Sequence, residues 1–151
     1  MKLALRPLLE ADIPAAVDVW KACRLVRPWN DPEADARLAL AGPASTIIGA
    51  AFPERLIGTA MCGWDGHRGW VYYLGVVPGF RRRGIARALM RECEAWLAMR
   101  DAPKIQLMVR EGNEDAARFY RSIGYAEQQY RIFSRRMAVA ESPPLDISTP
   151  A

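Results

Sequence analysis

The stretch GVVPGFRRRGIARALM, residues 75–90, decides how the chain folds, because it joins a Val-rich segment to an amphipathic one through three consecutive arginines. The first part predicts a strand that ends at Val77, and the part from Gly84 onward predicts a helix with one apolar stripe. A helix N-terminus presents unpaired N–H groups and about half a positive charge. Because Gly84 has no Cβ, backbone and ligand can come close together there.

The turn at residues 81–86 therefore favours an anion site, and phosphate suits it best. The alternative is a basic turn that only faces solvent. The spacing of its glycines matches neither the Walker phosphate loop nor the dinucleotide-binding fingerprint. The phosphate site is thus expected to be of a type other than these two.

Length and composition indicate one ordinary globular domain. The chain has 151 residues, of which 51% are hydrophobic and 25% charged. Its apolar runs are much shorter than the roughly 20 residues that cross a bilayer, and the N-terminal MKLALRPLLEAD lacks the pattern of a signal peptide. We therefore expect a cytoplasmic protein with no membrane partner. The cysteines Cys23, Cys62 and Cys93 show no metal-ligand or redox spacing, so reduced thiols and no metal are expected.

The net charge of +4 would permit a nucleic-acid partner. Such a partner requires basic groups spread over one face, together with stacking aromatic residues. Here the densest basic cluster lies on a single turn. We therefore expect a small polyanion and no nucleic acid.

The hydrophobic periodicity predicts a mixed α/β order, β-α-α-β-β-β-α-β-α-β-β. The predicted strands cover residues 3–8, 45–52, 56–64, 70–77 and 104–109, with two more in 125–137, and the predicted helices cover 10–23, 31–42, 84–100 and 113–124. The domain is expected to span residues 1–137. The proline-rich tail, residues 138–151, is expected to pack weakly or to be disordered.

Two motifs together resemble those of a known family. RRRGIA (81–86) fits the pattern R/Q-x-x-G-x-G/A, and NEDAARFYRSIGY (113–125) fits N-x-x-A-x-x-F-Y-x-x-x-G-[FY]. In this order, with YYLGVVPGF (72–80) before the first, they resemble the GNAT superfamily of acetyl-CoA-dependent N-acetyltransferases over residues 3–137. LVRPWNDPE (25–33) and DGHRG (65–69) further resemble its YpeA-type subgroup, close to the ribosomal-protein N-terminal acetyltransferases.

The resemblance implies a GNAT fold of the α/β (α+β) class. Its central sheet is mixed and mostly antiparallel, is splayed between the fourth and fifth strands, and is accompanied by about four helices. It also implies acetyl-CoA as co-substrate, with the pyrophosphate on the backbone of Arg81, Arg82, Arg83, Gly84, Ile85 and Ala86. The pantetheine arm would lie along Leu74, Gly75 and Val76, and Asn113 would contact CoA. Gly75 has a second interpretation as a packing glycine, and Asn113 as a plain helix cap.

Catalytic roles follow from the same resemblance. Tyr120 matches the tyrosine that protonates the leaving thiolate, although a tyrosine at the edge of the core would look the same. The nearest relatives carry a glutamate base five residues before the matching asparagine, where this chain has Met108. Glu111 is the nearest replacement, and Asp65 and His67 are alternatives; a histidine titrates in the useful range, but turns also favour such polar pairs.

The expected activity is acetyl transfer to a primary amine by direct attack, the amine being a protein N-terminus, a lysine or a small molecule. Trp29 and Asn30, with Asp65 and His67, are candidate acceptor residues, while Trp29 could equally cover the core. A non-catalytic acyl-CoA-binding module is the alternative function, which Met108 favours and Tyr120 opposes. The sequence leaves the acceptor and the oligomeric state open, a homodimer included.

Overall fold

A computed structural model describes residues 2–137 of the chain. The elements are β1 (Ala4–Pro7), η1 (Glu10–Asp12), α1 (Ile13–Ala22), α2 (Pro32–Ala41), β2 (Ser45–Phe52), β3 (Arg55–Trp64), β4 (Gly69–Val76), η2 (Pro78–Phe80), α3 (Ile85–Ala98), β5 (Ile105–Leu107) and α4 (Glu114–Ser122).

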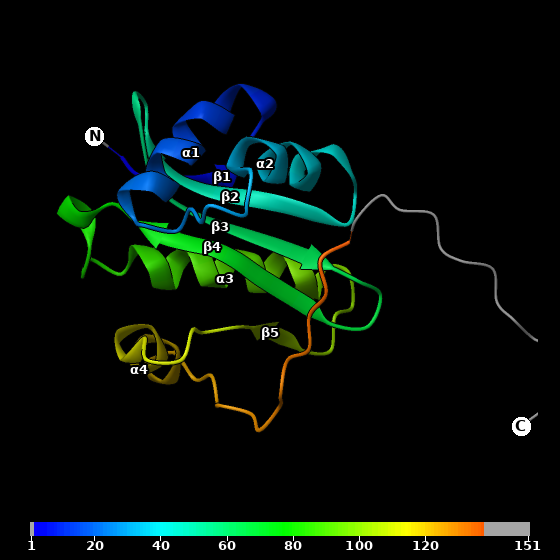
Figure 1. Ribbon diagram of the computed structural model, residues 1–151. Coiled ribbons are helices and arrows are strands. Elements are labelled where there is room, and N and C mark those ends of the chain that lie inside the picture. Colours follow the sequence, from blue (N-terminus) through cyan, green and yellow to red (C-terminus); the bar gives the residue numbers. More distant parts are fainter. Residues whose placement is uncertain (1, 138–151) are drawn as a thin grey trace, which may run out of the picture.

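One sheet organises these elements, with the strands in sequence order from β1 to β5. Each neighbouring pair from β1 to β4 is antiparallel, and β4 pairs with β5 in parallel. This confirms the predicted α/β class, the mixed and mostly antiparallel sheet and the four α-helices. In Figure 1, α1 and α2 cover one face of the sheet, and α3 covers the other.

The helix α3 shows why the opening stretch folds as it does. Gly84 precedes its first residue with a φ of +79°, a left-handed conformation that glycine adopts without steric cost. The following residues then bury one apolar stripe, which comprises Ile85, Leu89, Cys93 and Leu97, against β3 and its neighbours. The turn residues are consequently left at the surface, at the end of β4.

A bulge in β4 interrupts its pairing with β3. Thr59 pairs with Gly75 and Met61 pairs with Tyr72, so two residues of β4 face one residue of β3. Tyr73, in the bulge, has a φ of +52°, which is uncommon for a residue other than glycine. Its ring stacks on Trp20 with the centroids 3.9 Å apart.

A hydrogen-bonded chain holds this bulge from inside the core. The Trp20 indole donates to the hydroxyl of the fully buried Thr59 (2.8 Å), and that hydroxyl donates to the carbonyl of Tyr73 (2.9 Å). The Tyr73 hydroxyl in turn donates to the carboxylate of Asp35 on α2 (2.7 Å). The strained backbone is therefore fixed by contacts with β3 and with the two helices, α1 and α2, that cover one face of the sheet.

The predicted splay between the fourth and fifth strands is confirmed. β4 pairs with β5 only through residues 69–71, opposite 105–107. From Tyr72 to Val76, no strand of the described residues lies beside this edge of β4. Apart from the Val76 carbonyl, which accepts from the Arg81 side chain, the backbone groups of that edge are open to a ligand that can pair like a strand.

The prediction of two further strands in residues 125–137 is wrong, since this segment, although described, contains neither strand nor helix. It is held instead by side chains. The Tyr125 hydroxyl donates to Glu94 of α3 (2.7 Å), Arg121 pairs with Glu127 (3.1 Å), and Lys104 lies 5.9 Å from the Tyr130 ring. A three-residue β5 offers too short an edge for a long ladder, so periodicity alone overestimated the pairing.

The expectation for the tail, residues 138–151, lies outside the described residues. Within the described part of the chain, no helix has the length and apolar character needed to cross a membrane.

Candidate active site

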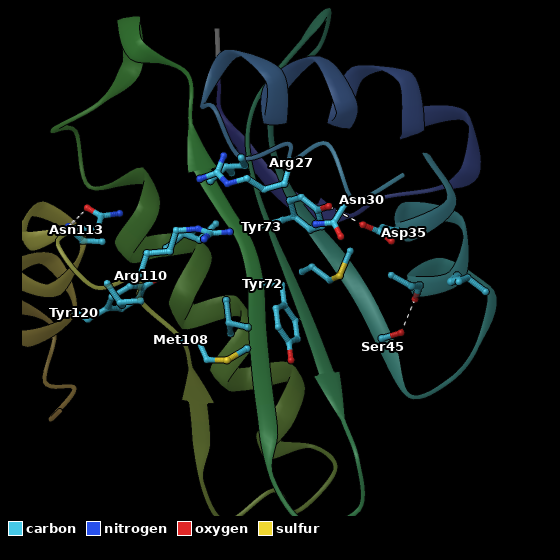
Figure 2. Close-up of a pocket in the computed structure, with 18 residues that line it drawn as sticks. Arg27, Asn30, Asp35, Ser45, Tyr72, Tyr73, Met108, Arg110, Asn113 and Tyr120 are labelled. Carbon is cyan, nitrogen blue, oxygen red and sulfur yellow. Dashed lines mark hydrogen bonds between the residues drawn. The ribbon is translucent and has the colours of Figure 1, made fainter. Parts of the chain in front are cut away.

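A cavity of about 640 Å³ opens where β4 and β5 part. Figure 2 shows its walls: α2 and the loop before it on one side, the chain after β5 and the helix α4 on the other, and β4 between them. The lining residues are Leu25, Arg27, Asn30, Asp35, Leu38, Ala39, Ser45, Met61, Val71, Tyr72, Tyr73, Leu74, Met108, Val109, Arg110, Asn113, Ala116 and Tyr120.

Of the sequence-predicted site residues, the structure brings Leu74, Asn113, Tyr120 and Asn30 to this cavity. Asn113 caps α4, because its side-chain oxygen accepts from the Ala116 N–H (3.2 Å). Its capping role is therefore present whatever else the residue does. Its exposed side chain also faces the cavity, so both roles can coexist.

Tyr120 lies at the α4 side of the cavity and packs among aromatic rings. The ring of Phe119 lies 5.1 Å away between centroids, and that of Tyr125 lies 5.9 Å away. Burial raises the pKa of Tyr120 to about 12. At neutral pH the group is therefore a protonated phenol, able to donate a hydrogen bond into the cavity.

The base candidates are distributed differently. Met108, at the position of the family's glutamate, lines the cavity and is 48% exposed. Glu111 is exposed and does not line the cavity, although Arg110 and Asn113 on either side of it do. Among residues 2–137, the one carboxylate that lines the cavity is that of Asp35, which sequence reasoning missed.

Asp65 and His67 lie in the exposed turn between β3 and β4, outside the residues that line the cavity. The Asp65 carboxylate accepts from the backbone N–H groups of Arg68 (2.7 Å) and His67 (2.8 Å), and from the Trp70 indole (3.1 Å). These hydrogen bonds, that of Arg68 first, lower the pKa of Asp65. The contacts are those of a well-formed turn.

The arginine turn lies at the other end of β4. Arg81 bends back, and its Nε donates to the Val76 carbonyl (2.8 Å). Arg83 lies over the Phe80 ring at 5.3 Å, and Arg55 of β3 lies over the same ring at 5.4 Å. In the part of the chain that the structure describes, no side chain caps α3, so its first N–H groups are available to an anion among these guanidinium groups.

Gly75 is required by packing. A Cβ built there would lie 2.9 Å from Cys23 Sγ and 2.9 Å from a methyl group of Leu25. The glycine therefore lets the loop after α1 lie directly on β4. Burial raises the pKa of the half-buried Cys23 thiol, which disfavours the reactive thiolate.

Trp29, expected at the acceptor site, does not line the cavity and is 52% exposed. It has two cationic neighbours instead. The guanidinium of Arg110 lies 5.7 Å from its ring centroid, and Arg136 donates to its carbonyl (3.2 Å). Trp29 thus joins the loop before α2 to the chain after β5 and to the segment 125–137, at the rim of the cavity.

Sequence reasoning did not single out Asp35, Tyr72, Tyr73 or Arg110 among the cavity residues. Asp35 looked like one more polar residue of an amphipathic helix, and Arg110 like the end of a strand. The available signal was the pair Tyr72–Tyr73 in an otherwise Val-rich strand. Consecutive side chains of a regular strand point to opposite faces, and the bulge is what lets both residues reach one cavity.

The fold and cleft place the chain in the class of α/β acyltransferases. Residues 13–125 match the model of the acetyltransferase (GNAT) family, and the chain belongs to this family. It is 37% identical over 137 residues, 91% of this chain and 97% of the relative, to Acetyltransferase YE1169 of Yersinia enterocolitica.

Two solved structures show the shared fold. One is AAC(6')-Iy in complex with a bisubstrate analogue, at a TM-score of 0.79, 17% identity and coverage of 91% of this chain and 100% of the other. The second is the ribosomal-protein-alanine N-acetyltransferase from Brucella melitensis, at a TM-score of 0.72, 22% identity and coverage of 90% and 100%. Within residues 2–137, no cluster of three His, Cys, Asp or Glu side chains could hold a metal ion.

The raised pKa of Tyr120 predicts a pH effect on stability. An unfolded phenol ionises near pH 10, whereas the folded group keeps its proton until about pH 12. The stability that depends on the protonated phenol is complete below pH 10 and is lost as the pH rises toward 12. We expect the free energy of unfolding in urea to fall over this interval, and to fall less steeply in Tyr120→Phe. Equal slopes in both proteins would contradict the assignment.

Proposed function

We propose that the chain transfers the acetyl group of acetyl-CoA to a primary amine by direct attack. The carrying observation is the edge of β4 from Tyr72 to Val76, which lacks a neighbouring strand and runs from the cavity to the basic turn. An elongated ligand with phosphates at one end and a reactive group at the other fits this arrangement. The structural neighbour AAC(6')-Iy, which has also been solved in complex with CoA, supports the proposal.

In this proposal the pyrophosphate is bound at the start of α3. The donors are the backbone N–H groups of Arg81, Arg82, Arg83, Gly84, Ile85 and Ala86, aided by the positive end of the helix. The pantetheine arm lies along Leu74, Gly75 and Val76 as an added strand. A backbone N–H of β4 polarises the thioester carbonyl, and Asn113 contacts CoA from the opposite wall.

Gly84→Ala is expected to abolish stabilisation by acetyl-CoA. The positive φ of Gly84 becomes costly with a Cβ, and the turn must change shape. In thermal melts, millimolar acetyl-CoA should raise the Tm of the wild type and leave that of the variant nearly unchanged. Gly66→Ala is the matched control, because Gly66 also has a positive φ and open space, but lies in the β3–β4 turn. If acetyl-CoA leaves the Tm of the wild type unchanged, the proposed cofactor site is refuted.

Tyr120 is proposed as the group that meets the departing thiolate. A phenol with a pKa near 12 is a weaker acid than a thiol, whose ordinary pKa is about 8.5. Tyr120 therefore stabilises the thiolate mainly as a hydrogen-bond donor, and the final proton comes from solvent. Removing the hydroxyl leaves the ring packing intact.

Tyr120→Phe should lower kcat by about 100-fold, the usual contribution of one such group, with little change in acetyl-CoA affinity. The measurement is steady-state CoA release with a saturating amine, alongside the acetyl-CoA melting shift. Tyr130→Phe serves as the control, because Tyr130 is 70% exposed and lies outside the cavity lining. An unchanged kcat in Tyr120→Phe would reduce Tyr120 to a packing role.

We propose that the attacking amine loses its proton to Glu111, through a water molecule held near this residue. Glu111 follows Arg110 and precedes Asn113, which both line the cavity, although its own exposed side chain does not. Proton transfer therefore requires a water relay between the amine and the carboxylate. Asp35 is the rival within the cavity, but its carboxylate already accepts from Tyr73. His67 is the more remote rival, in the β3–β4 turn.

Three variants separate these routes. Glu111→Gln is expected to lose most activity at every pH, whereas Asp35→Asn and His67→Ala keep it, since neither group takes the proton. Activity is measured as kcat/KM for the amine across the neutral and mildly alkaline range. Full activity in Glu111→Gln would contradict the proposal. A selective loss in Asp35→Asn would reassign the proton to Asp35.

A non-catalytic acyl-CoA-binding role is the second candidate. Its specific support is Met108, which lines the cavity where the nearest relatives have a base. Acetyl-CoA stabilisation that depends on Gly84, without CoA release on any amine, would select this alternative.

A further inference from the structure

The cavity carries an excess of positive charge. Of the lining side chains, those with a formal charge are Arg27, Arg110 and Asp35. Asp35 is already engaged with the Tyr73 hydroxyl at 2.7 Å. The net charge that faces an incoming acceptor is therefore positive.

Neither arginine forms an ion pair with a carboxylate of the described residues. Within residues 2–137, the ion pairs are Arg6–Asp12, Arg118–Asp115 and Arg121–Glu127. None of them involves the cavity. The charge of both cavity guanidinium groups is thus available to an anion.

Arg27 is held in place without its charge being cancelled. Its Nη1 donates to the carbonyl of Arg24 (2.7 Å) and to that of Val26 (3.3 Å), and the side chain is half-buried. These contacts use one nitrogen of a group with five N–H donors. The remaining donors form a fork of the kind that binds a carboxylate with two hydrogen bonds.

Arg110 comes from the opposite wall. It follows β5, and its guanidinium lies over the Trp29 ring at 5.7 Å. Its side chain makes no hydrogen bond or ion pair with the described residues. In Figure 2, Arg110 and Arg27 extend toward the same end of the cavity, away from Met108 and the Tyr72 hydroxyl. Two like charges directed to one region favour an anion between them.

The cavity also has an apolar part, which comprises Leu25, Leu38, Met61, Val71 and Met108, and Leu38 is 75% exposed. The other polar lining side chains, such as Asn30, Ser45 and Tyr72, carry no formal charge. An acceptor that fits has an apolar body and a single anionic group. A polycationic acceptor would instead bring several ammonium groups beside two unpaired arginines, which costs binding energy.

We propose that the acceptor is an amine that carries a carboxylate, which Arg27 and Arg110 bind while the amine attacks the thioester. This inference deepens the proposed function and rests on it. The carboxylate could belong to a free amino acid, or to an acidic side chain next to the N-terminus of a peptide.

Matched acceptors test the charge requirement. The pairs are L-methionine with L-methioninamide, and the amidated tripeptides Ala-Asp-Ala with Ala-Asn-Ala; neamine is the polycationic probe. We expect kcat/KM to be about 10-fold or more higher for the carboxylate member of at least one pair, as for a hydrogen bond to a charged group. The pair that shows the preference identifies the source of the carboxylate. The amide of an amino acid has the less basic amine, so a larger fraction of it is unprotonated at neutral pH, and this difference works against the expected preference. In the tripeptide pair the two N-terminal amines are both those of alanine, so basicity differs little.

Arg110→Gln should remove most of the preference by raising KM for the carboxylate acceptor, while the Tm shift with acetyl-CoA stays intact. Arg118→Gln, on the exposed surface of α4, should change neither quantity. An equal loss of acetyl-CoA stabilisation in Arg110→Gln would assign the arginine to the cofactor phosphates and overturn the inference. Faster acetylation of the amides or of neamine would overturn it while the proposed function stands.

If no amine is acetylated, the proposed function is refuted. The carboxylate site is then tested separately, by the binding of ligands that cannot react. N-acetylmethionine should then raise the Tm of the wild type more than N-acetylmethioninamide does, and should lose this advantage in Arg110→Gln. Equal Tm shifts with the two compounds would overturn the inference.

Discussion

The bulge in β4 is the constraint on which the site depends. The strand β4 stays paired to β3 along one edge and separates from β5 along the other. A regular strand would not by itself change direction in this way. The strained backbone at Tyr73 turns the strand, and the core holds it there through the stack on Trp20 and the hydroxyl of Thr59. The cleft is thus produced by interactions buried beneath it.

The same strand connects two chemically different ends. At one end, an uncapped helix and its arginines present permanent positive charge. At the other, Tyr120 contributes a neutral phenol whose pKa burial raises to about 12. Between them lies a backbone edge without a partner strand. The order of these features along β4 matches the order of groups in a long thioester cofactor. A few residues along one strand can therefore supply all the contacts that the proposed reaction needs.

The elements were predictable where local chemistry decides them. Gly84 and Asn113 each specify a helix start by backbone or side-chain geometry, and both starts are found as predicted. The cavity was less predictable, since Asp35 and Arg110 reach it through tertiary contacts that no local pattern records. The prediction of strands in residues 125–137 was wrong because a local pattern was present but its tertiary partner was not. Their composition resembles that of strands, whereas pairing depends on a neighbouring edge, and β5 supplies only three residues of it.

The placement of the proposed acceptor residues also bears on how such a protein can diverge. Arg27 and Asn30 lie in the loop before α2, and Arg110 lies in the chain after β5, so none belongs to the buried core. Substitutions there cost little folding energy, whereas changes at Trp20 or Thr59 would disturb the whole sheet. Selection can therefore alter which amine is accepted while the cofactor end stays constant. A scaffold divided in this way can yield many specificities from few mutations.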